Sequence, residues 1–454
     1  MFKCYVSIIF LIVSVLLVLL NACTAGEKPD GETDKKTVNI TESNTETTSD
    51  NESIIFLSTQ LNPAPEANKM RKFILKDFEG SVIFQPSDDG LINKMLDLEM
   101  ETNPHRSFLV GGLHGDLLNF KTEDSLKPLD DFLESLTGRK FIPDFVDLAK
   151  FNTKFLYYIP WMQATYLMAA NKKALKYLPK GADTDDLTYS ELILWGKNMY
   201  EATGVRKIGF PLGEKGLMYR FFQGYLYPSY TGSILKKFRS PEAVFMWTEF
   251  KELWKYVNPA SMVHSNMSQP LLTDDIWVTW DHSARLIKAL ETEPDEFIVF
   301  PAPAGPSGRG YIVVLSGLSI PRDSTVTKGA YNLIEYLTRP EIQIVTLNNT
   351  GFFPVVDFPE EKIESKALKQ FGKAISLQSK LPGGIPTLLP MGLGELGSEF
   401  NSIYLLAFSS IILENKNISS TLDNFSVRLQ NIMDKAGADC WPPDISTESP
   451  CLLE

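Results

Sequence analysis

Side chains that could support hydrolysis occur in this chain, but their spacing assembles no catalytic motif. The four histidines, at positions 105, 114, 264 and 282, show no His-x-x-x-His spacing, and no Gly-x-Ser-x-Gly segment marks a nucleophile. Adjacent acid pairs such as Asp274-Asp275 have the form of helix caps and loop charges. We therefore expect no metal, no cofactor and no enzymatic activity. A glycoside hydrolase stays open as an alternative, because its two carboxylates can lie anywhere in a sequence.

Cys23 is the residue with a distinct chemistry of its own. It follows an apolar run at 6–20 that is too short for a spanning helix, and Lys3 precedes that run. The sequence Leu20-Asn21-Ala22-Cys23 resembles a bacterial lipobox. We expect 1–22 to be a lipoprotein signal peptide and Cys23 to carry the lipid that holds the protein on the extracytoplasmic face of the bacterial envelope. An ordinary secreted protein with a chance cysteine is the alternative.

The composition separates a polar leader segment from a folded part. Residues 23–52 offer almost nothing apolar to bury and predict a disordered tether. The chain is 44% hydrophobic, which allows one large or two medium cores in the roughly 400 residues that follow. A formal net charge of −12 argues against nucleic acid as a partner. Outside the cytoplasm, Cys440 and Cys451 favour a disulfide within a C-terminal tail, 440–454.

In the first part of the folded chain, short apolar runs typical of strands alternate with segments whose apolar residues recur at helical spacing. Strands are predicted at 53–59, 81–85 and 107–110, and helices at 66–78 and 89–101. This alternation implies an α/β fold with a mainly parallel sheet, whose ligands lie beyond the carboxyl ends of the strands. Gln60 and Asn62 follow the first strand, and His114 and Asp116 follow the third. We expect these four side chains to face a binding site; ordinary loop residues are the alternative.

Helix signals are clearest in the middle of the chain. Thr188 and Glu191 form a capping box that opens a helix, and Ser240-Pro241 caps another. A further helix is predicted at 281–290, followed by strands at 297–303 and 311–315.

Five motifs in a fixed order carry a resemblance to a known family. They are Tyr158-Ile159-Pro160 followed by Asn171-Lys172, the Thr188–Glu191 helix start, 277–281, Pro301-Ala302-Pro303-Ala304-Gly305, and 314–320; Gly351-Phe352-Phe353-Pro354 completes the set. Together they resemble the family 1 extracellular solute-binding proteins of ABC importers, over about 54–435. Each motif alone is weakly specific.

The resemblance implies two α/β lobes, each a mainly parallel sheet flanked by helices, joined by chain crossings and closing on a solute. It assigns 53–159 and 316–350 to lobe 1, and 160–315 and 351–439 to lobe 2. The implied partners are a small-molecule solute, most simply a sugar or oligosaccharide, and the permease subunits of an ABC importer, with the protein itself a monomer. A peptide, a polyamine or a phosphate ester is the alternative solute.

Sugar sites combine flat aromatic rings with carboxylates, amides or histidines at the rim. Trp161 follows the crossing Pro160, and Gln163 and Thr165 alternate with it, so the three are predicted to share one wall. A place for Trp161 in the hinge core is the alternative. Further candidates are Trp280, Asp281 and His282 at a strand-to-helix turn, and Glu214 and Tyr219 after Phe210-Pro211. Asp281 could equally cap the helix that begins at Ser283.

Overall fold

The computed structural model describes residues 53–454 with the exception of 63, 122–124, 359 and 446–448. Our predictions for the signal peptide 1–22, for lipidation at Cys23 and for the tether 23–52 lie outside the described residues.

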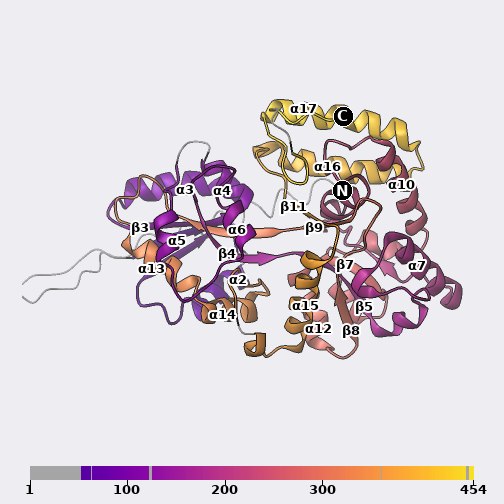
Figure 1. The fold of residues 1–454 in the computed structure, drawn as a ribbon, viewed down its shortest axis with the longest axis horizontal. Coiled ribbons are helices and arrows are strands. Elements are labelled where there is room, and N and C mark those ends of the chain that lie inside the picture. The colour runs from indigo at the N-terminus through magenta and orange to yellow at the C-terminus, as the bar shows by residue number, and fades with distance from the viewer. Residues whose placement is uncertain (1–52, 63, 122–124, 359, 446–448) are drawn as a thin grey trace, which may run out of the picture. The chain divides into compact units, whose positions relative to one another are not determined.

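The first lobe is built on a five-stranded sheet in the order β2-β1-β3-β10-β4. Its strands are β1 (Ile54–Ser58), β2 (Val82–Pro86), β3 (Ser107–Leu113), β4 (Ile159–Ala164) and β10 (Val314–Ser319). β1 pairs in parallel with β2 and β3, whereas β10 runs antiparallel to β3 and β4. The flanking helices are α2 (Ala64–Lys69), η1 (Met70–Ile74), α3 (Asp89–Thr102), α4 (His114–Lys121), α5 (Asp130–Ser135), α6 (Pro143–Leu148), α13 (Lys328–Leu337) and α14 (Pro340–Thr350) (Figure 1).

The second lobe is built on a four-stranded sheet in the order β6-β7-β5-β8. Its strands are β5 (Tyr166–Asn171), β6 (Ile208–Gly209), β7 (Val278–His282) and β8 (Phe297–Phe300), with β5 antiparallel to β7 and β8. A separate parallel pair joins β9 (Arg309–Ile312) to β11 (Gly384–Thr387). The longer helices are α7 (Tyr189–Thr203), α10 (Pro241–Trp254), α12 (Ser283–Thr292), α15 (Lys366–Lys380), α16 (Gly397–Phe408) and α17 (Ile418–Ala436).

Short helices complete the second lobe. They are η2 (Lys172–Tyr177), η3 (Thr184–Asp186), α8 (Met218–Phe221), the π-helix η4 (Phe222–Leu226), α9 (Tyr227–Thr231), η5 (Pro259–Met262), α11 (Ser268–Leu272), η6 (Glu360–Lys362), η7 (Gly394–Leu396) and the π-helix η8 (Ser409–Leu413).

Most predicted elements form, but several differ in their bounds; the predicted strand 297–303, for example, ends at Phe300. The predicted helix 66–78 divides into α2 and one π-helical turn, η1. The predicted helix 281–290 begins only at Ser283, because β7 continues to His282. The predicted strand 311–315 is divided at Val313, where β9 ends and β10 begins in the other sheet.

The core changes from one lobe to the other where the chain crosses between the sheets. Trp161 and Met162 pack with the first lobe, and Ala164 packs with the second. On the return, Val314 packs with the second lobe and Leu315 with the first. The lobe limits that we placed at 159 and 316 stay predictions, and the packing changes within a few residues of both.

The C-terminal tail packs on the second lobe. Cys440 and Cys451 are joined as a disulfide with their Cα atoms 4.7 Å apart, and Cys451 and Trp441 are buried. Asp444 is also buried, and its Oδ2 accepts the backbone N–H groups of Ile234 (3.0 Å) and Leu235 (2.7 Å). The tail therefore satisfies backbone groups of a distant turn.

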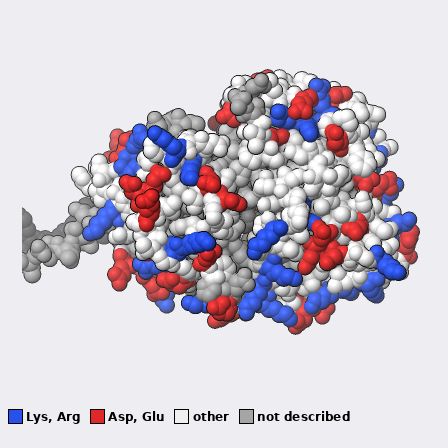
Figure 2. Space-filling view, in the orientation of Figure 1, with Lys and Arg blue, Asp and Glu red and all other residues white. Residues whose placement is uncertain are grey.

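One helical stretch of the described chain, Gly394–Leu413, has the length and apolar composition to cross a membrane. Its side chains at Phe400, Tyr404 and Phe408 are buried in the core of the second lobe, whereas Leu406 and Leu413 are exposed. Acidic and basic side chains are interspersed on the face shown in Figure 2.

Candidate functional site

Polar side chains meet at the carboxyl edge of the first sheet. Thr59, directly after β1, donates from Oγ1 to Oδ2 of Asp116 (2.6 Å), which also accepts the N–H of Leu113 (3.0 Å). Gln60 in turn donates from Nε2 to Oγ1 of Thr59 (3.0 Å). We call Thr59, Gln60 and Asp116 the edge triad. Gln60 and Asp116 thus both reach Thr59 at one edge of the sheet, because β1 and β3 are parallel neighbours, and their role in solute binding stays a prediction.

Asn62 does not join the edge triad. Its Nδ2 donates to Oδ1 of Asp88 (2.7 Å), at the start of α3.

His114 was predicted to face a binding site, and this placement is wrong in the structure. The side chain is 7% exposed, its Nδ1 lies 2.8 Å from the Tyr158 hydroxyl, and its ring packs 4.9 Å from that of Phe151. Burial lowers the pKa of His114 to about 4, so the imidazole is neutral at pH 7. Since it sits in the first turn of α4 directly after the buried β3, its side chain packs inward.

Trp161 does not form a wall with Gln163 and Thr165. The indole is fully buried and packs 5.6 Å from the ring of Phe56 in the first lobe. The cause is an irregularity in β4: Pro160 pairs with Gly317 and Met162 with Ser316, so Trp161 is an extra residue between them. A bulge of this kind breaks the alternation on which the shared wall depended.

Gln163 and Thr165 lie at the crossing itself. Gln163 exchanges backbone hydrogen bonds with Phe353 (2.9 and 2.7 Å) and donates from Nε2 to the carbonyl of Pro354 (2.7 Å). Thr165 is buried between β4 and β5, and its Oγ1 donates to the carbonyl of Ile312 (2.7 Å). Both therefore have structural hydrogen-bond partners where the chain crosses between the lobes.

Trp280 and Asp281 are buried in the second lobe, which corrects their assignment as site residues. Trp280 stacks on Tyr166 with ring centroids 4.8 Å apart and planes 6° from parallel. Asp281 accepts the N–H groups of Met267 (2.9 Å) and His282 (2.8 Å), and burial raises its pKa to about 7. It does not cap α12: His282 is the N-cap, accepting the N–H of Ala284 at Nδ1 (3.2 Å).

The remaining predicted residues are accessible. His282 is partly buried, its ring lies edge-on to Tyr166 at 4.9 Å, and desolvation lowers its pKa to about 3. Tyr219 is partly buried beneath the guanidinium of Arg220, which lies 4.9 Å from the ring centroid. Glu214 is exposed.

Several residues that sequence reasoning missed lie where the lobes meet. Leu148, Val313 and Phe352 pack against the cores of both lobes. A Cβ on Gly115, in the first turn of α4, would lie 3.4 Å from Cγ of Met391 in the second lobe. The pKa of Tyr311, in β9, is raised by burial and also by Asp144 of α6. Asp116 of the edge triad is thus the sequence neighbour of a residue at this junction, and Tyr311 and Phe352 are partly buried aromatic side chains at the same junction.

Within the described part of the chain, no group of three or more His, Cys, Asp or Glu side chains is placed to hold a metal ion.

Buried His114 and partly buried His282 predict a loss of stability in acid. Unfolded histidine takes up a proton near pH 6.5, whereas folded His114 and His282 do so only near pH 4 and 3, so the unfolded state is favoured as pH falls below 6.5. Buried Asp281 acts in the opposite direction, because its raised pKa lets the folded state keep a proton between about pH 4 and 7. Between pH 6.5 and 5, the free energy of unfolding of His114→Gln should fall by about 1–2 kcal/mol less than that of the wild type. Chemical denaturation at both pH values measures this.

His105→Gln is the matched control, because His105 is exposed. The control should keep the pH dependence of the wild type. An unchanged pH dependence in His114→Gln would contradict the buried, neutral state of His114.

Two α/β lobes joined by chain crossings, with a polar edge beside the junction, define the two-lobed periplasmic-binding-protein fold. The family profile of the bacterial extracellular solute-binding proteins matches residues 109–344, and the chain belongs to this family. It is therefore a solute-binding protein of the kind that serves ABC transporters.

Solved structures share the fold at low sequence identity. A maltose-bound MalE3 of T. maritima is 17% identical (TM-score 0.62; 84% of this chain and 100% of that chain covered). Lmo0181 of Listeria monocytogenes, in complex with cycloalternan, is 13% identical (TM-score 0.63; 85% and 100%). UgpB of Mycobacterium tuberculosis, in complex with glycerophosphocholine, is 18% identical (TM-score 0.62; 84% and 98%). No curated protein matches the sequence.

Proposed function

We propose that this protein captures a sugar or oligosaccharide between its two lobes and delivers it to the permease of an ABC importer. The observation that carries this proposal is the edge triad next to Gly115, where an added Cβ would lie 3.4 Å from Cγ of Met391 in the other lobe. The triad offers carboxylate, amide and hydroxyl groups to sugar hydroxyls, and Tyr311 and Phe352 offer rings to the apolar faces. The solutes named for the maltose and cycloalternan complexes support the choice of a sugar.

A phosphodiester solute is the second candidate. The glycerophosphocholine complex of UgpB shows that a protein of this fold takes such a solute, and Arg220 adds a partly buried guanidinium to the second lobe. The test is calorimetric titration of the full chain with mono- and oligosaccharides and with glycerophosphocholine. Binding of a saccharide supports the proposal, and binding of glycerophosphocholine alone replaces it with the second candidate.

The edge triad gives this test a matched pair of variants. Asp116→Asn removes the negative charge of the carboxylate that accepts the hydrogen bond from the Thr59 hydroxyl. This variant should bind saccharide roughly tenfold more weakly. Asn62 lies outside the triad and bonds to Asp88 instead. The Asn62→Ala variant should therefore bind the saccharide as tightly as the wild type. Equal losses in both variants would place the site elsewhere.

The proposed anchor predicts a change of location without a change of binding. Cys23→Ser removes the acceptor thiol for the lipid, so the protein should move from the membrane fraction to the soluble fraction. Its solute affinity should stay the same, because the edge triad lies in the folded part. Fractionation followed by titration checks both points, and a variant that stays in the membrane fraction would contradict lipidation at Cys23.

The proposal includes no catalytic step. Members of the family bind and hand over their solute, and we infer that this chain does the same. Incubation of the protein with each saccharide that it binds, followed by chromatography, would reveal cleavage if a glycoside hydrolase were present.

A further inference from the structure

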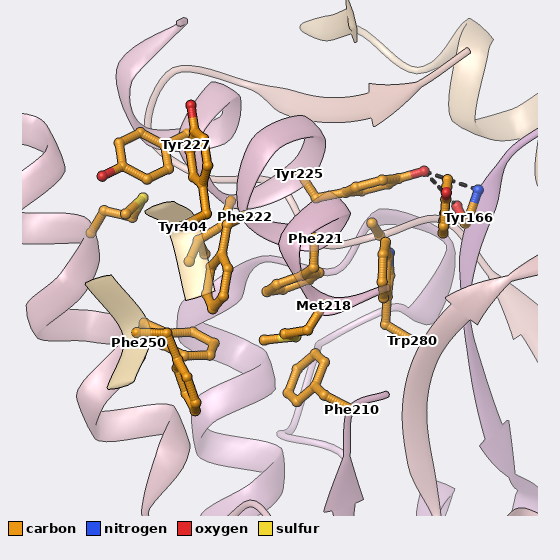
Figure 3. Close-up of a cluster of buried hydrophobic side chains, with 14 of the residues drawn as sticks. Tyr166, Phe210, Met218, Phe221, Phe222, Tyr225, Tyr227, Phe250, Trp280 and Tyr404 are labelled. Atoms are coloured by element: carbon orange, nitrogen blue, oxygen red, sulfur yellow. Dashed lines mark hydrogen bonds between the residues drawn. The ribbon is translucent and has the colours of Figure 1, made fainter. Parts of the chain in front are cut away.

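A buried tyrosine hydroxyl holds the point at which β4 passes into β5. The Tyr225 hydroxyl accepts the N–H of Tyr166 (3.0 Å) and donates to the carbonyl of the same residue (2.9 Å). It also lies 3.2 Å from Oγ1 of Thr165. Figure 3 shows the ring of Tyr225 reaching from its helix toward this point, beside Trp280. One side chain thus forms hydrogen bonds with both the N–H group and the carbonyl group of the first residue of β5.

Thr165, at the same point, also binds the segment in which the chain returns to the first lobe. Thr165 donates from Oγ1 to the carbonyl of Ile312 (2.7 Å), the last residue of β9 before the chain returns to the first lobe. Buried Gln378 of α15 donates from Nε2 to Oγ1 of Thr165 (3.0 Å). We call Thr165, Tyr225 and Gln378 the hinge clasp. It links two crossing segments and a helix in one buried hydrogen-bonded group.

The hinge clasp is adjacent in sequence to residues that make contacts between the lobes. Gln163, two residues before Thr165, is paired with Phe353, and Val313, next to Ile312, packs against both cores. Tyr225 itself sits in the π-helix η4, a local irregularity that is frequent at functional sites. The rotation that closes a two-lobed protein must be absorbed by a few such crossing residues.

We propose that Tyr225 is a positioning residue for lobe closure: its hydroxyl fixes the second-lobe end of one crossing segment directly and that of the other through Thr165, so that bending is confined to the residues between the lobes. This inference rests on the proposed function, because it concerns closure on a solute. Without the clasp, the crossing strands can bend over a longer stretch, so the solute-free protein samples more lobe orientations. Binding must then restrict a broader ensemble, which weakens affinity without the loss of a solute contact.

Tyr227 offers a matched control two residues further along the chain. It is fully buried like Tyr225, and its hydroxyl also holds two partners, donating to the carbonyl of Phe238 (3.1 Å) and accepting from Nε1 of Trp247 (3.1 Å). Those partners lie inside the second lobe, away from the crossings. Tyr225→Phe and Tyr227→Phe therefore each remove a buried hydroxyl that both donates and accepts a hydrogen bond, and only the first removes contacts at the crossing segments.

The test measures the distance between the lobes in the full chain without solute. Spin labels on unnatural keto side chains at the exposed positions Leu98 and Val263 leave the disulfide intact. Tyr225→Phe should broaden the distance distribution, whereas Tyr227→Phe should leave it unchanged although both lower the melting temperature. Thr165→Val, which removes the hydroxyl that binds Ile312, should broaden the distribution as well and serves if Tyr225→Phe does not fold.

With a solute found by titration, Tyr225→Phe should bind roughly three- to tenfold more weakly than Tyr227→Phe. An unchanged distribution in both Tyr225→Phe and Thr165→Val, or equal broadening in Tyr227→Phe, would overturn the role of the hinge clasp. The distance measurement needs no solute. A failure to bind any saccharide would therefore refute the proposed function separately.

Discussion

Trp161→Ala is expected to lower the free energy of unfolding by about 3–5 kcal/mol, the cost of deleting a large buried aromatic side chain. Trp161 has no exposed surface, packs against Phe56, and belongs to the core of the first lobe. Its carbonyl also accepts Nε2 of Gln343 (2.7 Å), so the bulged backbone is held in place. Chemical denaturation without solute measures the loss.

Trp254→Ala is the control for this prediction. Trp254 is only partly buried at the end of α10, so its loss should be smaller. If Trp161 instead formed a wall of the site, as the sequence predicts, Trp161→Ala would weaken solute binding by roughly tenfold to a hundredfold with little change in stability. That result would show that Trp161 reaches the solute after all.

Gly115→Phe is expected to weaken solute binding by roughly a hundredfold or more, because it places a ring where the lobes meet. A Cβ at this position already lies 3.4 Å from Met391 and 3.7 Å from the carbonyl of Pro390. A larger side chain must therefore displace the second lobe and hold the protein open. The solute-free melting temperature should change little, since Gly115 lies in the first turn of α4 and outside both cores. Titration calorimetry and thermal melting measure the two effects.

Gly115→Ala is the matched control. Its methyl group makes ordinary van der Waals contact at 3.4 Å, and alanine favours the helix. Its solute affinity should equal that of the wild type. Tight binding by Gly115→Phe would show that closure does not bring α4 against Met391.

The alternation of strands and helices and the order of the motifs predicted the two-lobed α/β fold and the family. Local signals were sufficient for many elements: the capping box at Thr188 and Glu191 and the N-cap at Ser240 form as expected, because a cap depends on residues three positions apart. The meeting of Gln60 and Asp116 was also predictable, since adjacent parallel strands end at the same edge.

Only the tertiary structure decided which aromatic residues are core and which are accessible. Alternation along 161–165 predicted a shared wall, but the strand register with β10 makes Trp161 an extra residue and buries it. Trp280 is likewise buried because Tyr166 and Tyr225, which lie far from it in the sequence, enclose it. Gly115 carries no side chain, and its position opposite Met391 depends on how the two lobes pack. The sequence determined the elements and the fold through local and periodic patterns, whereas the site depends on strand register and on contacts between distant segments, which local patterns do not encode.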